Sequence, residues 1–421
     1  MKILLISFTV SPFRGSEFSV AWNYITRMSQ EHELFVIYGS SGDRSFEDFG
    51  NTDEMQDWLK NNSIENVHFI DVRIVRNWWI KFNMSLLKYN DVLPYYIVYK
   101  HWHKEAYRKA KEIVSNEKID IIHYLNPIGF KEPGFCWKIK EVPYVWGPMQ
   151  GVENRPLPLL KVLSVHEKVN VLARRIIHNA AFVFSPRVRK AINCADVIFS
   201  ATPNTQKMLQ KYYAKKSVYL PENGIRRMFV SKPITYAEHQ TLNLIWVGEV
   251  GARKALRILI DALFIIKDDN WHLDVCGNGP KMQEIERLSE KYGIRDKISF
   301  KGNISREDVQ KYFSKSHLHI ISSLGEATTT VLFEAMAWGV PTMTLDHCGM
   351  SGVVCEKCGI KIPIKSYRQV TTDMAKTIDE IIINPKKIGI LSNGVLECSK
   401  HFMWENRAKV FSDTYNELLK K

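Results

Sequence analysis

The sequence alternates short apolar segments, rich in β-branched residues, with longer segments of helical periodicity. We predict strands at residues 2–8, 33–38, 119–125, 195–201, 243–248, 272–277, 317–323 and 340–345. The helical pattern is clearest at residues 256–266 and 280–293. Strands that alternate with helices form parallel sheets covered by helices on both faces. The sequence therefore predicts an α/β fold of doubly wound parallel sheets.

The length of 421 residues is too great for one such sheet, because domains usually hold roughly 100–200 residues. We predict two Rossmann-like domains, residues 1–215 and 216–402, and a terminal helix, residues 403–421, that returns to the first domain. No apolar segment reaches the roughly 18 residues that a membrane span needs. The first residues are interpreted as a buried strand and not as a signal peptide, since Pro12 and Arg14 follow the apolar stretch too soon.

Basic residues exceed acidic residues by 58 to 45, which gives a formal charge of +13. Such a surplus suits nucleic acid, an anionic membrane surface or a phosphorylated small molecule. The 7 cysteines are odd in number and scattered, which favours a reducing cytoplasm. Cys355 and Cys358 form a CxxC pair, but without a second ligand pair this is a weak zinc signal, and we predict no metal site.

Two cations follow the first predicted strand of the second half. Arg253 and Lys254 come shortly after Gly248, at the carboxyl end of strand 243–248, where open α/β sheets bind ligands. They would match a diphosphate, although a solvated basic turn is an equal alternative. The next strand ends in CGNGP, whose Gly277 and Asn278 belong to a loop that permits close backbone approach.

The segment EATTTVLFEAMAWGVP, residues 326–341, is the most specific signal. Three threonines, Thr328, Thr329 and Thr330, are candidate caps of a helix whose positive N-terminus suits an anion. Carboxylates such as Glu326 and Glu334 can accept from the vicinal hydroxyls of a sugar. The alternatives are a dipole-stabilising role for Glu326 and a salt bridge on the helix for Glu334.

These pieces fall in the order of a known family. The chain resembles the retaining glycosyltransferases of family 4, on the E-x7-E and EAMAWGVP of residues 326–341, PENGIRRMF at 221, RKALRILIDAL at 253, CGNGP at 276 and FKGNIS at 300. FRGSEFSVAW at 13 and YVWGPMQG at 144 are similar to loops of a branch that builds bacterial surface polysaccharides. The resemblance implies the GT-B architecture, in which two Rossmann-like domains face each other across a cleft.

The resemblance also implies roles for individual residues. It assigns catalysis to Glu326, Lys254, Arg253 and His123. Donor binding falls to Glu334, Gly15, Gly248, Gly277, Asn278, Thr328, Thr329 and Thr330, and the acceptor side to Glu17, Gly147 and Gln150. From the residues alone, a histidine at position 123 could equally serve in packing or capping.

The implied reaction moves a hexose from a nucleotide diphosphate sugar to a saccharide acceptor in lipopolysaccharide, capsule or other surface-glycan assembly. We expect this acceptor to be lipid-linked. The sequence has no Asp-x-Asp motif, so we expect a metal-independent enzyme without a cofactor, in which Lys254 and Arg253 balance the diphosphate. Glu249 stands where the family often has arginine, and Ala327 and Thr329 replace glycines, so the sugar is not identified.

Two windows of the first half are basic and apolar. Residues 71–110 and 151–200 each hold 8 basic and 3 acidic residues. The first also has aromatic residues, and the second has a stripe, Val165, Val169, Leu172 and Ile176, bordered by Lys161, Lys168 and Arg175. These windows either dock a cytoplasmic protein on the inner face of the cytoplasmic membrane or are core-facing helices with solvated cations.

Two other functions compete. A nucleotide-sugar epimerase on the same architecture would turn over donor without an acceptor. Nucleic-acid binding would use the positive charge, but none of the usual signatures is present, and we expect no nucleic-acid partner.

Overall fold

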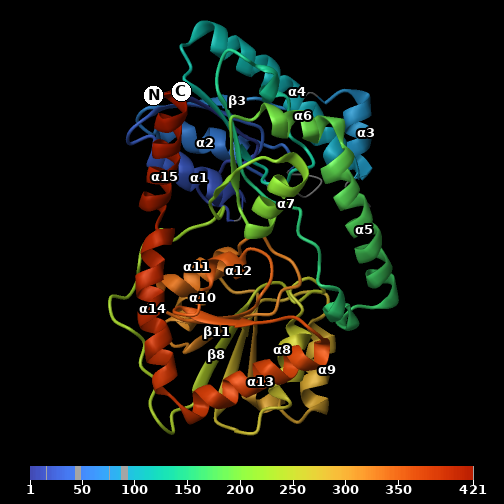
Figure 1. The fold of residues 1–421 in the computed structure, drawn as a ribbon, viewed down its shortest axis with the longest axis vertical. Coiled ribbons are helices and arrows are strands. Elements are labelled where there is room, and N and C mark those ends of the chain that lie inside the picture. Colours follow the sequence, from blue (N-terminus) through green and yellow to red (C-terminus); the bar gives the residue numbers. More distant parts are fainter. Residues whose placement is uncertain (16, 43–48, 75, 87–92, 421) are drawn as a thin grey trace. The chain divides into compact units, whose positions relative to one another are not determined.

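The computed structural model describes residues 1–15, 17–42, 49–74, 76–86 and 93–420. Contacts divide the chain into two units, drawn in Figure 1. Unit 1 comprises Met1–Val152, Ile177–Glu222 and Trp404–Lys421, and unit 2 comprises Glu153–Ile176 and Asn223–Met403. Within the described ranges, no helix is both long and apolar enough to cross a membrane.

Unit 1 is built on a seven-stranded sheet in which every strand pairs in parallel with its neighbours. The strand order is β3-β2-β1-β4-β5-β6-β7. The strands are β1 (Lys2–Ser7), β2 (Glu33–Tyr38), β3 (Val67–Asp71), β4 (Ile121–Asn126), β5 (Tyr144–Met149), β6 (Val197–Ser200) and β7 (Val218–Tyr219). The first six follow the Rossmann order, so the order reverses between β1 and β4.

Helices bury both faces of this sheet. Leu4 and Ile6 of β1 belong to one core cluster, while Ile3 and Leu5 point to the other. This alternation explains why the strand reads as a continuous apolar run. The helices are α1 (Glu17–Met28), α2 (Asp53–Asn61), α3 (Trp78–Leu86), α4 (Leu93–Asn116), η1 (Cys136–Lys138), α6 (Pro186–Cys194), α7 (Pro203–Tyr213) and α15 (Trp404–Leu419).

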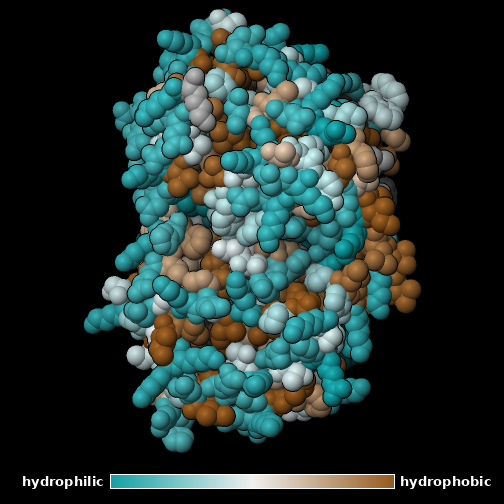
Figure 2. Space-filling view, viewed as in Figure 1, coloured by the Kyte–Doolittle hydropathy of each residue, from teal (hydrophilic) through white to brown (hydrophobic). Residues whose placement is uncertain are grey.

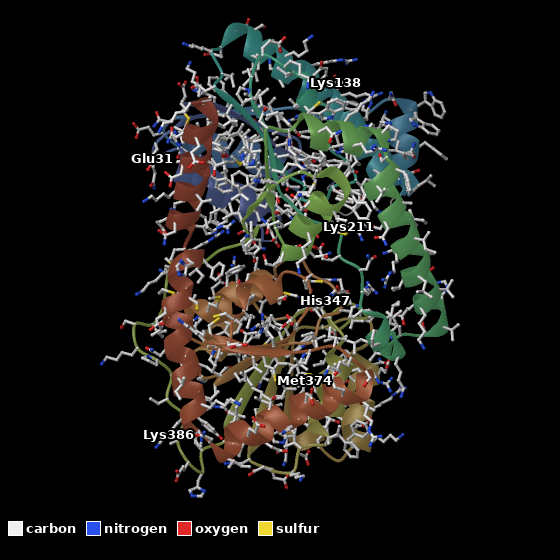
Figure 3. All side chains as sticks on the ribbon, viewed as in Figure 1. Glu31, Lys138, Lys211, His347, Met374 and Lys386 are labelled. Carbon is white, nitrogen blue, oxygen red and sulfur yellow. The ribbon has the colours of Figure 1, made fainter. Side chains whose placement is uncertain are left out.

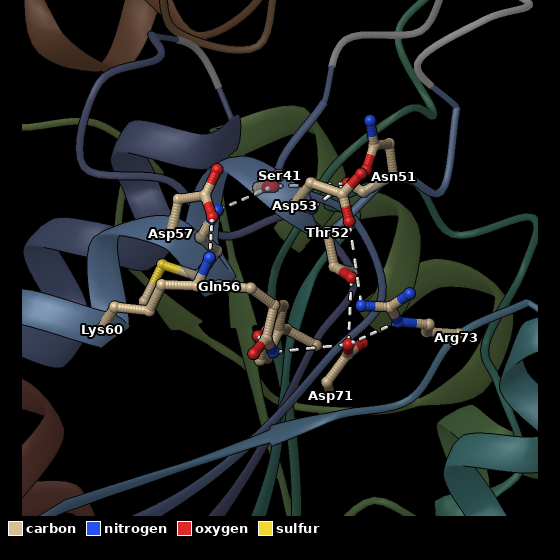
Figure 4. A network of polar contacts seen from close by, with 11 residues as sticks. Ser41, Asn51, Thr52, Asp53, Gln56, Asp57, Lys60, Asp71 and Arg73 are labelled. Atoms are coloured by element: carbon tan, nitrogen blue, oxygen red, sulfur yellow. Dashed lines mark hydrogen bonds and ion pairs between the residues drawn. The ribbon is translucent and has the colours of Figure 1, made fainter.

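A polar network holds the start of α2 against the end of β3 (Figure 4). Asp71 accepts hydrogen bonds from the Thr52 hydroxyl at 3.0 Å and from Arg73 Nε at 2.9 Å. Gln56, one turn into α2, contacts the same carboxylate at 3.3 Å. Thr52 is the N-cap residue of α2, but its hydroxyl makes no capping bond because it is engaged with Asp71. Side chains therefore fix this edge of the sheet.

Unit 2 repeats the architecture with a six-stranded parallel sheet in the order β10-β9-β8-β11-β12-β13. Its strands are β8 (Leu242–Val247), β9 (Trp271–Cys276), β10 (Ile298–Gly302), β11 (Leu318–Ile321), β12 (Thr342–Leu345) and β13 (Gly359–Ile362). Its helices are η2 (Leu157–Val162), α8 (Leu256–Leu263), α9 (Met282–Lys291), η3 (Arg295–Lys297), α10 (Arg306–Phe313), α11 (Thr330–Ala337), α12 (Met350–Val353), α13 (Tyr367–Ile383) and α14 (Lys386–Phe402). Figure 3 labels Met374 on α13, whose side chain is part of the core. The strand order reverses between β8 and β11.

The segment Glu153–Ile176 differs from the predicted division, which placed it in the first domain. Leu159 and Leu160 of η2 belong to the main core cluster of unit 2, and Lys281 pairs with Glu167 at 3.4 Å. α5 (Val165–Phe184) passes from unit 2 into unit 1 after residue 176. The other crossings follow Glu222 and Met403, a few residues from the predicted boundaries.

The predicted fold class of two Rossmann-like parallel-sheet domains is confirmed. All eight predicted segments contain strands. The prediction missed β3, β5, β7, β10 and β13, which are short or carry glycine, proline or charge.

The C-terminal helix α15 packs in unit 1 and reaches His123 on β4. The Tyr415 hydroxyl lies 2.6 Å from His123 Nδ1 and 2.7 Å from the Tyr24 hydroxyl of α1. His123 Nε2 lies 2.6 Å from the Gly147 carbonyl, so this nitrogen carries the proton and Nδ1 accepts. His123 is fully buried, and burial lowers its pKa to about 4.

The catalytic role that the resemblance implies for His123 does not fit this position. The residue lies within β4 and not at its end, and both ring nitrogens are engaged inside the core. The packing role that the residues alone left open is the one the structure shows.

The buried histidine predicts acid sensitivity of the fold. An unfolded histidine titrates near pH 6.5, so as the pH falls the unfolded chain takes up the proton before the folded chain does. Stability is then lost between about pH 6.5 and 4, and His123 should account for about 2 kcal/mol of the loss from pH 7 to 5. Urea unfolding at both pH values should show this loss, and His123→Asn should lack that share of it.

The control for this prediction is His239→Asn, at an exposed position whose left-handed φ of 63° asparagine tolerates. That variant should keep the wild-type pH dependence. An unchanged pH dependence in His123→Asn would contradict the account of His123.

Candidate functional site

The loops after β8 and β11 meet where the strand order of unit 2 reverses. Ligands bind in this position in open α/β sheets, because the chain continues to opposite faces of the sheet after the two central strands and leaves a crevice at their carboxyl ends. Backbone and side-chain bonds join the two loops: the Leu324 N–H donates to the Arg253 carbonyl at 2.8 Å, and the Ser322 hydroxyl donates to the Lys254 carbonyl at 2.9 Å. The two predicted cations and Glu326 are therefore held by one rigid edge.

Glu326 accepts from both predicted cations. Lys254 Nζ lies 2.8 Å from Glu326 Oε1, and each side chain is only 11% exposed. Arg253 pairs with the same oxygen but is 43% exposed. A charge at this burial must be paired, since an isolated ion out of water is costly. The alternative of a solvated basic turn does not describe Lys254.

Glycines bring the strand ends close to the lysine. Gly248 and Gly277 have φ values of 151° and 146°, which side chains rarely adopt. A Cβ on Gly277 would lie 1.8 Å from the Gly248 carbonyl oxygen, and one on Gly248 would lie 3.1 Å from Lys254 Cε. The Val250 N–H donates to the carbonyl of the exposed Asn278 at 2.9 Å. These predicted donor-binding residues thus also form the backbone surface next to Lys254.

Glu334 lies on α11 and is paired with a residue that the sequence did not reveal. Its Oε1 accepts from Arg306 Nε at 2.8 Å and lies 2.6 Å from Arg306 Nη2. Glu334 and Glu326 have different partners. The structure shows the salt bridge that was the alternative for Glu334, and Arg306 is half exposed.

The threonine run starts α11, but not by side-chain capping. Thr329 occupies the N-cap position with extended backbone, and its hydroxyl makes no capping bond, so that part of the prediction is wrong. Thr330 is the first residue of the helix, and the Thr328 carbonyl accepts from Asn223 at 3.2 Å. A Cβ on Gly349 would lie 1.7 Å from the Ala327 carbonyl. Close packing, rather than a hydroxyl, therefore fixes this loop.

Arg155 is a further cation that sequence reasoning missed. Its Cγ lies 3.8 Å from the position of a Cβ on Gly325, immediately before Glu326. Burial, followed by repulsion from Arg174 and Arg253, lowers the pKa of the Arg155 guanidinium. Arg155 thus adds a partly buried cation close to Arg174 and Arg253. No spacing pattern could reveal Arg155, because 98 residues separate it from Arg253 and 170 residues separate it from Gly325 in the chain.

The residues predicted for unit 1 divide into two groups. Glu17 starts α1 near the end of β4, and its Oε1 accepts from the Ile128 N–H at 3.4 Å. Gly15 is exposed with open space around it, and Gln150 pairs with Gly129 in an isolated bridge. These three lie around the carboxyl ends of β1, β4 and β5.

Gly147 belongs with His123 in the interior. A Cβ there would lie 2.2 Å from the Phe199 carbonyl, at a φ of 127°. Its carbonyl accepts from His123, so its position is explained by packing. Ser16 of the same predicted loop as Gly15 lies outside the described residues.

Comparison with known proteins supports the resemblance at a coarse level. Residues 234–392 match the family model for glycosyl transferases group 1. An uncharacterized glycosyltransferase of Methanocaldococcus jannaschii is 23% identical over 313 residues, 74% of this chain and 80% of that one. The lipopolysaccharide glucosyltransferase WaaG of Escherichia coli is 26% identical over 203 residues, 47% of this chain and 46% of that one.

The fold is also that of solved structures. Anabaena HepE in complex with UDP superposes with a TM-score of 0.64 at 15% identity, over 99% of this chain and 100% of that one. This likeness shows the fold of the whole chain. The segment 234–392, which holds Lys254, Glu326 and Glu334, matches the model of group 1 glycosyl transferases, and one relative of the chain is a lipopolysaccharide glucosyltransferase.

Proposed function

We propose that this protein is a retaining glycosyltransferase of the family 4 type, which moves a hexose-type sugar from a nucleotide diphosphate sugar to a saccharide acceptor in surface-glycan assembly. The observation that carries the proposal is the pairing of Lys254 and Arg253 with one carboxylate at the strand reversal of unit 2. The match to group 1 glycosyltransferases and the likeness to WaaG support it. No comparison supports an epimerase.

The donor diphosphate would replace Glu326 as the partner of the two cations. Its phosphates carry more negative charge than one carboxylate, and Arg155 adds to the positive field nearby. Guanidinium and ammonium groups already in place stabilise the charge that develops on the departing diphosphate without reorganisation. Released from Lys254, the Glu326 carboxylate could accept from hydroxyls of the donor sugar.

Glu334 would serve the ribose in the same way. Its salt bridge with Arg306 orients the carboxylate on α11, and its second oxygen can accept from vicinal hydroxyls.

In the transfer, the bond from the anomeric carbon to the leaving phosphate oxygen breaks. The bond to the acceptor oxygen forms on the same face, and the acceptor proton passes to the phosphate. We assign no metal or cofactor to these steps.

Lys254→Ala tests the diphosphate role. A thermal-shift panel of UDP-, GDP- and ADP-sugars first identifies the donor, and release of its nucleoside diphosphate is then measured. We expect Lys254→Ala to slow transfer by roughly 30- to 1000-fold, which corresponds to about 2–4 kcal/mol of lost charge stabilisation. The control Lys291→Ala, exposed on α9, should retain the wild-type rate. A near-normal rate in Lys254→Ala would remove the lysine from the mechanism.

We further propose that an apolar strip of α5 docks on an anionic membrane, which would present a lipid-linked acceptor. The strip, here the α5 surface, consists of Val165, Val169, Leu172 and Ile176, which are 44–77% exposed. Figure 2 shows hydrophobic residues gathered over this helix. Lys161, Lys168 and Arg175 border it. The exposure argues against the alternative of a core-facing helix, and the cations favour anionic lipid.

The basic aromatic window 71–110 supports the proposed membrane docking only in part. Trp78, Trp79 and Phe82 of α3 are exposed, but Tyr99 and Trp102 are buried in the core of unit 1. Tyr89 lies outside the described residues.

Ile176→Glu should weaken binding to phosphatidylglycerol vesicles about tenfold, since burying an isoleucine contributes about 1.5 kcal/mol or more. Vesicle co-sedimentation measures this, and binding should fall with salt and be weak on phosphatidylcholine. The matched control is Ile390→Glu on α14, because both isoleucines are 71% exposed. Equal vesicle binding by the two variants would exclude the α5 surface as the docking site.

A further inference from the structure

Three cysteine thiols converge in unit 2, and none of them is among the residues assigned to sugar transfer. Cys355 and Cys358 lie in the turn between α12 and β13, and Cys398 lies on α14. The Cys355 sulfur is 3.5 Å from the Cys358 sulfur and 3.4 Å from the Cys398 sulfur. All three sulfurs lie within 4.8 Å of one another, and no other His, Cys, Asp or Glu cluster in the described ranges meets this test.

The spacing suits a tetrahedral metal. Zinc–sulfur bonds of about 2.3 Å place neighbouring thiolates at a tetrahedral site about 3.8 Å apart. The Cys355 sulfur is slightly closer than this to each of the other two sulfurs, so a small outward shift of Cys355 accommodates the ion. The pair in the turn has the C-x2-C spacing that is common in zinc sites, and Cys398 adds a third ligand from a separate helix.

The turn is shaped to support thiolate ligands. The N–H groups of Cys358 and Gly359 donate to the Cys355 carbonyl at 3.1 and 3.0 Å. Backbone hydrogen bonds from Lys357 and Cys358 reach the Cys355 sulfur, and the Cys355 N–H lies 3.3 Å from the Cys358 sulfur. Hydrogen bonds of this kind orient the sulfur atoms.

A glycine brings the third thiol into reach. A Cβ on Gly394 would lie 1.9 Å from the Lys357 carbonyl oxygen, so α14 approaches the cysteine turn more closely than any side chain would allow. Gly394 and Cys398 are four residues apart and share one face of the helix. The approach that needs a glycine at 394 therefore also directs Cys398 toward Cys355.

We propose that Cys355, Cys358 and Cys398 bind one Zn²⁺ ion, with water in the fourth position. Cys358 is buried, while Cys355 and Cys398 are partly exposed, so solvent reaches one side of the cluster. The ion joins the turn before β13 to the end of α14.

The ion has a structural role that is independent of the sugar-transfer reaction. Met403 follows α14 directly and forms a β-bridge with Ile225. Met403 is also the last residue before the chain leaves unit 2. Zinc therefore anchors the segment from which the chain crosses into unit 1.

Metal analysis of the intact chain, purified under reducing conditions, tests the proposal. Elemental mass spectrometry should find one zinc ion per wild-type chain. The zinc content of Cys398→Ser should be less than a tenth of the wild-type content. The control is Cys194→Ser on α6 of unit 1, which is also partly exposed and lies outside the cluster. It should keep the full zinc content, and adding Zn²⁺ to the chelated wild type should raise its melting temperature.

A second measurement keeps the proposal testable if Cys398→Ser does not fold. Co²⁺ added to the metal-free wild type should produce an intense thiolate-to-cobalt band that Zn²⁺ abolishes. Absence of this band, or of zinc binding in competition with a chromophoric chelator, would overturn the proposal. So would a zinc-free chain whose intact mass shows two hydrogens lost, since that result assigns the thiols to a disulfide. Loss of zinc with unchanged sugar transfer would leave the proposed function standing.

Discussion

Lys254 and Glu326 form the ion pair on which the candidate site depends. Both side chains are almost buried at the point where the strand order of unit 2 reverses, and Lys254 Nζ lies 2.8 Å from Glu326 Oε1. Neither charge could remain there alone without a cost of several kcal/mol. Glu326 thus acts as the counter-ion of Lys254, and a ligand that brings negative charge can exchange with it. Arg253 and the half-buried Arg155 raise the positive charge beyond what Glu326 balances, which is the condition for attracting a diphosphate.

The backbone makes this pairing possible. Positive φ values at Gly248 and Gly277 bring two strand ends within a distance that no side chain permits, and Lys254 lies against that surface. A glycine also allows close contact of backbones at position 394, where α14 approaches the cysteine turn. In both places the glycine allows close approach of backbones, and a chemically active side chain then reaches its partner. The proposed diphosphate site and the proposed zinc site are separate results of one packing rule.

The sequence predicted the fold and the residues around Lys254 well, because strand periodicity and the E-x7-E spacing are local signals. It could not reveal Arg155, Arg306 or Cys398, since each meets its partner only through tertiary packing. The catalytic role of His123 was implied by the resemblance, and the structure buries this residue within β4. A strand pattern does not tell whether a histidine in the strand faces the core or a ligand. The segment Glu153–Ile176 was assigned to the first domain by its order in the chain, whereas its apolar residues pack with unit 2.

The central claim is that Lys254 and Arg253 bind a diphosphate in exchange for Glu326. Calorimetric titration of the wild type and of Lys254→Ala with a nucleoside diphosphate and the matching monophosphate tests it directly. We predict that the wild type binds the diphosphate at least about tenfold more tightly, a difference of about 1.4 kcal/mol, and that Lys254→Ala loses this preference. Equal affinity of the wild type for both nucleotides, or an undiminished preference in Lys254→Ala, would contradict the account.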